Sequence, residues 1–266
     1  MQTFLNDFYQ GRVESAQLQL SNYRVMQCHQ CDLLYQSEIL NPEGLNLLYN
    51  DWVDQSKSLQ KKRSASSKLF KQYAGQMQSL QALFAARPAD IRVLDYGMGW
   101  GYWARLAQAH GFDVSGVELS KQRAEHARGM GLLVLDSLPA EGGQYHFIYA
   151  NQVFEHLTDP RQAMFDLSRS LLPDGVMHIR VPDGRGIAAN LRQRGWSGEL
   201  GAIHPLEHIN CFSRASLKYL AGDAGMEVIN PPLRLHRGSL IGGMRREIAD
   251  RFFTTHLYLR KRRREA

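Results

Sequence analysis

The feature that most constrains the fold is a glycine-rich turn that follows a short apolar run. The run Val93–Asp95 ends in a carboxylate, and Gly97, Gly99 and Gly101 follow at alternate positions. Glycine allows the backbone to turn tightly and to approach a ligand closely. In an open parallel sheet such a turn lies at the carboxyl edge of the strands, where ligands bind. The turn therefore predicts a ligand site at that edge.

A second carboxylate indicates which ligand the site holds. Glu118 ends the next apolar run, where a carboxylate suits the hydroxyls of a ribose. The third glycine of a dinucleotide fingerprint is missing, because Tyr102 stands at its position. Asp95 would repel a phosphate and favours a cationic group such as an amine or a sulfonium. The pattern favours a positively charged adenosyl ligand over NAD.

Apolar runs and helical patterns alternate between residues 92 and 181. The runs predict strands, and the segments between them predict helices because their apolar residues recur every three to four positions. This alternation implies a parallel sheet with helices on both faces. The predicted strands are Arg92–Asp95, Val114–Glu118, Leu132–Leu135, Phe147–Ala150 and Met177–Val181, and the predicted helices are Gly101–His110, Ser120–Met130 and Arg161–Leu172.

Two further segments complete a family pattern. Tyr149–Pro160 follows the fourth predicted strand, and Leu171–Val176 reads as a turn centred on Asp174-Gly175. Together with the glycine-rich turn, they resemble the motifs of class I S-adenosylmethionine-dependent methyltransferases. The resemblance implies an α/β fold with a Rossmann-like, seven-stranded and mostly parallel sheet, an antiparallel last strand and helices on both faces. Met226–Ile229 and Phe252–Arg260 match the sixth and seventh strands.

The resemblance implies S-adenosylmethionine as the cofactor and carries its binding residues to the ends of the strands. The glycine-rich turn would hold the amino-acid end of the donor, Glu118 the ribose, and the segment after the third strand the adenine. The expected cofactor-binding residues are Asp95, Gly97, Gly99, Gly101, Glu118, Leu119, Asp136, Ser137 and Asn151.

A later segment, His204–Ser213, points to the acceptor. It resembles a signature of methyltransferases that act on sugars and other small metabolites. That likeness places Glu207 and His208 beside the acceptor, with the His208 imidazole as a general base for an acceptor that must lose a proton. His156, which follows the fourth strand, and His204 are further candidates for this base. Each histidine has a purely structural role as its alternative.

The first 67 residues form an N-terminal extension of different character. Cys28 and Cys31 form a Cys-x-x-Cys knuckle between two short predicted strands, but a structural zinc needs four ligands. The knuckle therefore resembles a degenerate zinc ribbon, and the sequence predicts no metal site. Tyr49, Trp52 and Tyr73 are candidates for lining or covering the cofactor site, but a core role is favoured for each of these aromatic side chains. We expect the extension to include a helical cap, residues 68–260 to form the methyltransferase domain, and residues 261–266 to form a basic tail.

The basic segments of the sequence are also compatible with binding to nucleic acid or to an anionic membrane. The net charge of +6 is concentrated in Arg260–Arg264 and Lys61–Arg63. A nucleic-acid methyltransferase needs such basic surface, yet the proline-containing motifs of base-modifying enzymes are missing after the fourth strand. The basic tail also suits weak peripheral contact with an anionic membrane. The alternatives are therefore a nucleic-acid methyltransferase, which the sequence disfavours, and a non-catalytic S-adenosylmethionine-binding module.

The sequence also predicts where in the cell the protein is located. No apolar run approaches the ~18 residues of a membrane span, and residues 1–7 lack the features of a secretory signal. We therefore expect a cytoplasmic protein, monomeric or homodimeric, that transfers a methyl group to the oxygen, carbon or nitrogen of a small-molecule acceptor. The identity of that acceptor does not follow from the sequence.

Overall fold

A seven-stranded sheet organises the computed structural model, which describes residues 2–13, 18, 23–196, 201–230 and 255–262. The strand order is β5-β4-β3-β6-β7-β10-β9. β10 alone runs antiparallel to its neighbours, β7 and β9. The strands are β3 (Arg92–Tyr96), β4 (Asp113–Val117), β5 (Leu133–Leu135), β6 (Tyr145–Asn151), β7 (Leu171–Arg180), β9 (Met226–Ile229) and β10 (His256–Lys261). The predicted fold class is confirmed.

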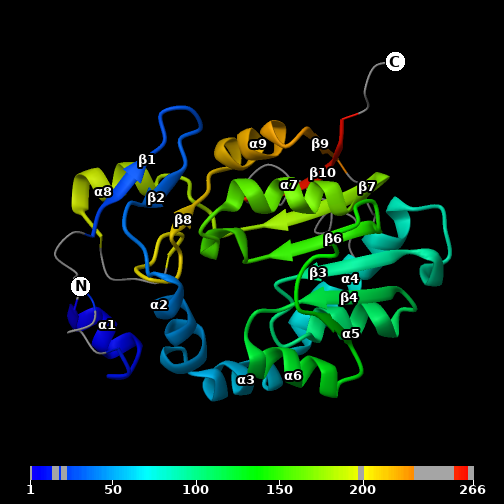
Figure 1. Ribbon diagram of the computed structural model, residues 1–266, viewed down its shortest axis with the longest axis horizontal. Coiled ribbons are helices and arrows are strands. Elements are labelled where there is room, and N and C mark those ends of the chain that lie inside the picture. The colour runs from blue at the N-terminus through cyan, green and yellow to red at the C-terminus, as the bar shows by residue number, and fades with distance from the viewer. Residues whose placement is uncertain (1, 14–17, 19–22, 197–200, 231–254, 263–266) are drawn as a thin grey trace.

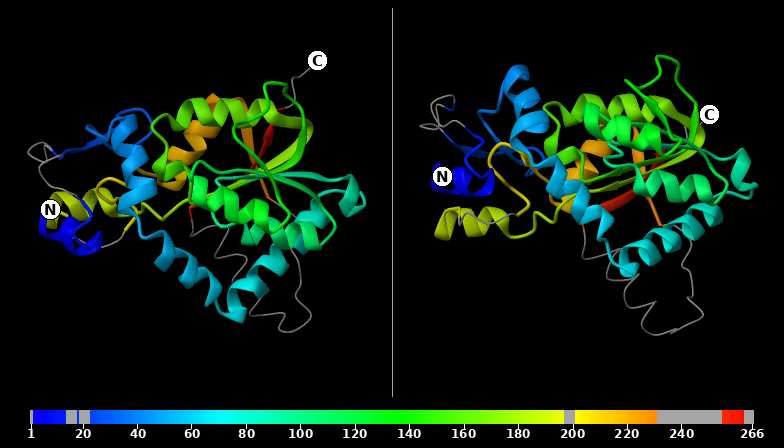
Figure 2. Two further views of the ribbon diagram at one scale, coloured as in Figure 1. Left: turned by 60° about the horizontal axis from the view of Figure 1, so that its bottom comes forward. Right: turned by 90° about the horizontal axis from the view of Figure 1, so that it is seen from below.

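Alternating side chains of the strands build a core on each face of the sheet. Val93 and Phe147 pack with one set of helices, whereas their neighbours Leu94 and Ile148 pack with another set on the opposite face. Figures 1 and 2 show the resulting three layers. The first set is α4 (Ser67–Leu83), α5 (Tyr102–Ala109) and α6 (Lys121–Gly129), and the second is α7 (Pro160–Ser170) and α9 (Arg214–Asp223).

Local sequence signals mark the starts of α7 and α9. The Asp159 side chain accepts a hydrogen bond from the Gln162 backbone N–H, and Pro160 occupies the first turn of α7. Ser213 and Ser216 form a reciprocal capping box at the start of α9. The core therefore follows largely from local periodicity and capping.

The N-terminal extension lies beyond one end of the large sheet, beside the segment that precedes α9 (Figure 1). The hairpin around Cys28 and Cys31 pairs through its second strand with β8, so that early and late parts of the chain share a small sheet. The elements here are α1 (Gln2–Phe8), β1 (Val25–Gln27), β2 (Leu34–Gln36), α2 (Pro42–Leu47), the π-helix η3 (Leu48–Trp52), α3 (Gln55–Arg63), α8 (Ile187–Arg194) and β8 (Asn210–Cys211).

Several elements differ from the sequence-based expectation. Helices α1, α3 and α8 were not predicted. The expected Asp174-Gly175 turn lies inside β7 instead, where pairing with β6 shifts register between Tyr145 and Phe147. Two short 3-10 turns, η4 (Pro88–Asp90) and η5 (Phe154–His156), precede β3 and α7. Residues 252–254 of the expected seventh strand lie outside the described residues.

Candidate functional site

The glycine-rich turn leaves β3 at the carboxyl edge of the sheet. Gly97, Gly99 and Gly101 all have positive φ angles, +73°, +56° and +76°. A Cβ on Gly97 would lie 2.5 Å from a methyl of Val153, and one on Gly101 would lie 2.8 Å from Leu132, so both positions require glycine. A Cβ on Gly99 would meet nothing within 4 Å. The middle of the turn thus offers backbone to an open space.

Glu118, at the end of β4, is held against this turn. Its Oε2 accepts a hydrogen bond from the Gly99 N–H at 2.8 Å, and its Oε1 accepts one from the Ser120 N–H at 2.8 Å. A carboxylate has about four acceptor positions, so each oxygen keeps one for a further donor such as a ribose hydroxyl. The geometry suits the role expected of Glu118.

Asp95 lies beneath the turn and is only 3% exposed. Burial, and then the nearby charge of Glu118, raise the pKa of Asp95 to about 8. Ionised Asp95 would be stabilised by a cation bound above the turn. A sulfonium or an ammonium group fits this environment, whereas a phosphate does not.

The remaining expected donor residues lie at neighbouring strand ends. Leu119 follows β4 and is 82% exposed, which leaves an apolar side chain free to cover an adenine ring. Asp136 and Ser137 follow β5 and are exposed, and Asp136 makes an ion pair of 3.0 Å with Arg128. Asn151 ends β6. Because β3, β4, β5 and β6 are adjacent parallel strands, the structure brings all nine expected donor residues to one edge, and they fit an adenosyl ligand with a cationic end.

The N-terminal extension reaches over this edge. The Trp100 indole N–H in the glycine-rich turn donates to the Ser58 hydroxyl of α3 at 3.0 Å. Arg123 on α6 donates to the Gln55 side chain of α3 at 3.0 Å. Trp52 is buried in the cap itself, in a cluster with residues of α1 and η3. Helix α3 is therefore tied to two of the elements that surround the expected donor site.

The acceptor segment forms a tight turn held by a residue that the sequence did not single out. The backbones of His204 and His208 pair as an isolated bridge, with Leu206 at φ +71° between them. The side-chain amide of Gln36, buried on β2, donates to both carbonyl oxygens, of His204 at 2.8 Å and of His208 at 3.1 Å. The small sheet of the extension thus fixes the turn that presents Glu207 and His208.

Glu207 connects this turn to the cap and to the sheet. Its Oε1 accepts a hydrogen bond of 2.7 Å from the hydroxyl of Tyr9, which is itself buried. Burial and the Glu207 carboxylate raise the pKa of Tyr9. The backbone oxygen of Glu207 accepts a hydrogen bond of 2.8 Å from Nδ1 of His156. Tyr9 lies 198 positions away from Glu207, and no local pattern in the sequence marks the pair.

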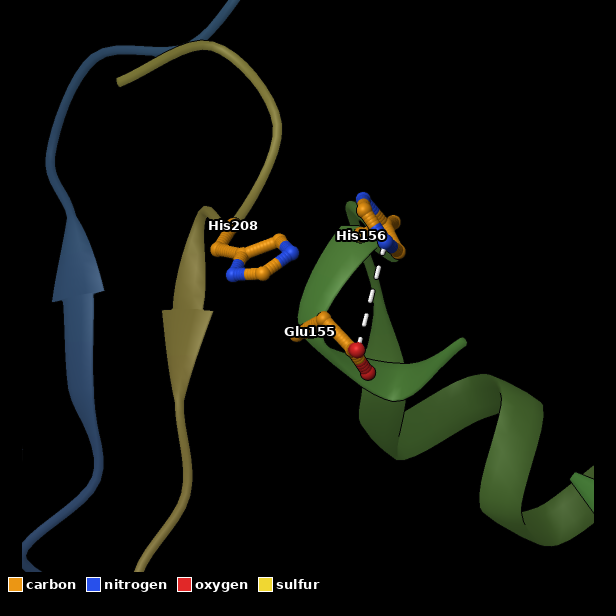
Figure 3. A group of neighbouring side chains, drawn as sticks. All are labelled: Glu155, His156 and His208. Carbon is orange, nitrogen blue, oxygen red and sulfur yellow. Dashed lines mark ion pairs between the residues drawn. The ribbon is translucent and has the colours of Figure 1, made fainter. Parts of the chain in front are cut away.

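His156 and His208 face each other at the end of β6. Their ring centroids are 4.9 Å apart, and the Glu155 carboxyl group lies close to the His156 ring (Figure 3). Burial, and then His208, lower the pKa of His156 to about 3, and burial lowers the pKa of His208. Burial raises the pKa of Glu155 to about 8. Near neutral pH both imidazoles are uncharged, so the 3.9 Å contact between His156 Nε2 and Glu155 is not an ion pair.

The hydrogen bonds of the two imidazoles fix which nitrogen is free. Nδ1 of His208 lies 2.8 Å from the Gly201 carbonyl oxygen, and Nδ1 of His156 lies at the same distance from the Glu207 carbonyl oxygen. A carbonyl only accepts, so each Nδ1 carries the hydrogen, and each Nε2 presents a lone pair. His204 differs, because its fully buried ring packs among Phe4, Phe8 and Tyr9. We assign His204 to packing.

The structure also describes part of the basic C-terminal segment and the Cys-x-x-Cys knuckle. Arg260 forms an ion pair of 2.6 Å with Glu227, and Lys261 donates a hydrogen bond of 2.6 Å to the Leu171 carbonyl oxygen. Both side chains of β10 therefore contact other strands of the large sheet. Cys28 and Cys31 are free thiols in the hairpin turn. Among the described helices, none is both long and apolar enough to cross a membrane.

Comparison with known families gives the assignment. A family profile described as a methyltransferase domain matches residues 67–230, which is more than half of the chain. The chain belongs to this methyltransferase family. The match confirms the predicted class of enzyme, a methyltransferase.

Individual relatives are more distant. Over 170 residues the chain is 28% identical to a malonyl-[acyl-carrier protein] O-methyltransferase of Enterobacter lignolyticus (strain SCF1), covering 59% of this chain and 65% of the relative. Over 100 residues it is 31% identical to a ubiquinone biosynthesis O-methyltransferase of Caulobacter sp. (strain K31), covering 34% of this chain and 40% of the relative. The chain thus spans less than two thirds of the length of either curated relative.

Part of this chain resembles a solved structure at low sequence identity. An S-adenosylmethionine-dependent methyltransferase from Thermotoga maritima is 24% identical, with a TM-score of 0.43, over 58% of this chain and 71% of that protein. The fold described above is established by the strand order and directions of this chain.

Proposed function

We propose that this protein transfers the methyl group of S-adenosylmethionine to a hydroxyl oxygen of a small-molecule acceptor. The observation that carries the proposal is the pair of uncharged imidazoles, His156 and His208, whose Nε2 lone pairs lie free beside the carboxyl edge of the sheet. Methyl transfer from a sulfonium needs mainly proximity and orientation, but a hydroxyl acceptor must also lose a proton. The histidine pair is available to promote that loss.

The donor is assigned to the glycine-rich turn. Asp95 with Gly97, Gly99 and Gly101 would hold the amino-acid end, and the free acceptor positions of Glu118 would receive the ribose hydroxyls. Exposed Leu119 would cover the adenine, with Asp136 and Ser137 at its edge and Asn151 towards the reacting centre. This assignment uses the residues that the adjacent strand ends bring together.

The acceptor is assigned to the space between the sheet edge and the cap. Glu207 and His208 enter from the turn before β8, and His156 from η5 after β6. Tyr49 of the cap contacts the His156 ring at a centroid distance of 6.2 Å. An oxygen acceptor also agrees with the names of both curated relatives, which are O-methyltransferases.

A small-molecule acceptor is favoured over nucleic acid because two residues of the basic segment Arg260–Arg264 already have partners within the protein. Arg260 and Lys261 are engaged by Glu227 and by the Leu171 backbone. Contact of Arg260–Arg264 with an anionic membrane, the monomeric or homodimeric state and a cytoplasmic location stay predictions.

Labelled methyl transfer tests this function. The full chain would be incubated with methyl-labelled S-adenosylmethionine and panels of sugars, phenols and carboxylic acids, with RNA and DNA as a separate panel, and S-adenosylhomocysteine would be quantified. We expect turnover in a small-molecule panel. His208→Asn should lower kcat by about 10²–10⁴-fold with little change in donor affinity. Turnover only on nucleic acid, or wild-type kcat in folded His208→Asn, would contradict the proposal.

A matched control separates the site from general effects of losing a histidine. His110 is exposed at the end of α5, and its Nδ1 lies 2.8 Å from the Leu106 carbonyl oxygen of the same helix. His110→Asn should retain wild-type kcat and donor affinity. Equal losses in both variants would mean that His208 has no special role.

A further inference from the structure

We propose that Glu155, His156 and His208 bind a divalent transition-metal ion, with Zn²⁺ as the ion that suits these ligands best. The proposal rests on the proposed function and deepens it, because it names what holds the acceptor oxygen. In the described part of the chain, one carboxylate oxygen of Glu155, one ring nitrogen of His156 and one ring nitrogen of His208 all lie within 4.8 Å of one another. The sequence predicted no metal site, since its only candidate pattern was the cysteine knuckle.

The histidines are oriented as metal ligands are. A metal-bound histidine almost always donates its other ring N–H to a carbonyl or a carboxylate, which fixes the ring and the tautomer. Here Nδ1 of His156 is bound to the Glu207 carbonyl oxygen and Nδ1 of His208 to the Gly201 carbonyl oxygen, each at 2.8 Å. Both Nε2 atoms are left with a lone pair for the ion.

Glu155 supplies a second, independent observation. Its residue is fully buried, and neither carboxylate oxygen has a hydrogen-bond partner. Buried polar groups are nearly always satisfied, so an exception needs an explanation. The side chain points from η5 towards the space shared with the two imidazoles (Figure 3). A cation bound by both histidines would satisfy this carboxylate directly.

The spacing requires only a small closure. His156 Nε2 and the nearer Glu155 oxygen are 3.9 Å apart. Ligand atoms about 2.0–2.2 Å from a tetrahedral zinc are about 3.3–3.6 Å from each other, so the side chains must close by roughly 0.3–1.5 Å. Two histidines and one carboxylate form a ligand set of catalytic zinc sites, which keep a fourth position open.

An acceptor hydroxyl bound at the fourth position would lose its proton to solvent more readily, because a metal ion lowers the pKa of a bound oxygen acid. Its oxygen would then bond to the methyl carbon of the donor. The carbon–sulfur bond breaks, and its electron pair stays on the sulfur of S-adenosylhomocysteine. In this arrangement His208 is a metal ligand and does not itself take up the proton.

Cobalt titration tests the site without relying on activity. The full chain would carry Cys28→Ser and Cys31→Ser, so that the half-buried thiols of the knuckle cannot bind the probe, and would be freed of metal with a chelator. We expect Co²⁺ to bind one ion per chain at micromolar concentration or tighter, with visible absorption bands of a four- or five-coordinate ion. Zn²⁺ should displace it.

Variants in the same background locate the ion. Glu155→Gln keeps the size of the side chain, and His208→Asn removes one imidazole. Each should weaken Co²⁺ binding by at least about 10- to 100-fold, because loss of a ligand costs no less than loss of an outer-shell partner. His110→Asn should bind like the parent, and circular dichroism would check that each variant is folded. His156→Gln serves if one of them does not fold.

Absence of the cobalt bands in the parent protein, or unchanged affinity in folded Glu155→Gln, would overturn the metal site. Methyl transfer that proceeds in excess chelator would overturn it as well, while the proposed function would stand. One ion bound per chain with no turnover on any acceptor panel would retain the metal site and refute the function. The two proposals thus fail in different ways.

Discussion

Replacing Glu118 by alanine should separate the donor site from the rest of the fold. The carboxylate accepts two backbone N–H groups, from Gly99 and Ser120, and each oxygen keeps a position for a ribose hydroxyl. A hydrogen bond to a charged group contributes about 1.5–3 kcal/mol, so loss of one ribose contact should weaken S-adenosylhomocysteine binding about 10- to 150-fold.

The two backbone N–H groups would be released at the same time. Glu118 is half-buried, so water can reach them, and we expect the unfolding free energy to fall by only about 1–2 kcal/mol. Isothermal titration calorimetry measures the affinity, and urea denaturation measures the stability. Glu125→Ala, an exposed change on the neighbouring helix α6, is the matched control. Affinity within twofold of wild type in folded Glu118→Ala would refute the assignment of the ribose to this residue.

Three other substitutions test the surroundings of the site. Gly97→Ala places a Cβ 2.5 Å from a valine methyl, so urea denaturation should show it about 1–3 kcal/mol less stable than Gly143→Ala, which has a similar positive φ but open space. Tyr9→Phe removes the donor to Glu207 and should lower the unfolding free energy by about 1–2 kcal/mol; an unchanged value would exclude a structural role for that hydrogen bond. The raised pKa of Asp95, about 8 when folded, means that the native state keeps a proton that the unfolded chain releases above pH ~4. Wild-type stability relative to Asp95→Asn should therefore fall by on the order of 3 kcal/mol between pH 5 and pH 8, measured by urea denaturation without ligand, and a difference that does not vary with pH would contradict the assigned pKa.

The central sheet could be predicted because its signals are local. Each of the strands β3 to β7 overlaps the apolar run that predicted it, and the start of α7 follows from Asp159 and Pro160 alone. The residues expected to bind the donor were assigned by resemblance and stay predictions, but their position at one edge follows because adjacent parallel strands end there. Helix α8 was missed because it is short, and its apolar residues Ile187, Ala188 and Leu191 are only partly buried, against a small satellite cluster.

The acceptor side could be predicted only in part. Glu207 and His208 were expected by resemblance and His156 from its position after the fourth strand, but the contacts that orient them come from distant parts of the chain. Gln36 is 168 positions before His204, and no pattern of one sequence reveals that separation. The convergence of Glu155 with His208 likewise depends on the packing of β8 against η5, which is a tertiary event.

The central claim is that the glycine-rich turn binds the adenosyl group of the methyl donor, and one titration tests it most directly. Wild-type protein would be titrated by calorimetry with S-adenosylhomocysteine and, in parallel, with NAD. The carboxylate of Glu118, the open backbone at Gly99 and the Tyr102 side chain in place of a third glycine predict one S-adenosylhomocysteine bound per chain at micromolar affinity, and no NAD bound at that site. Micromolar NAD binding that S-adenosylhomocysteine does not displace, with no binding of S-adenosylhomocysteine itself, would contradict the account.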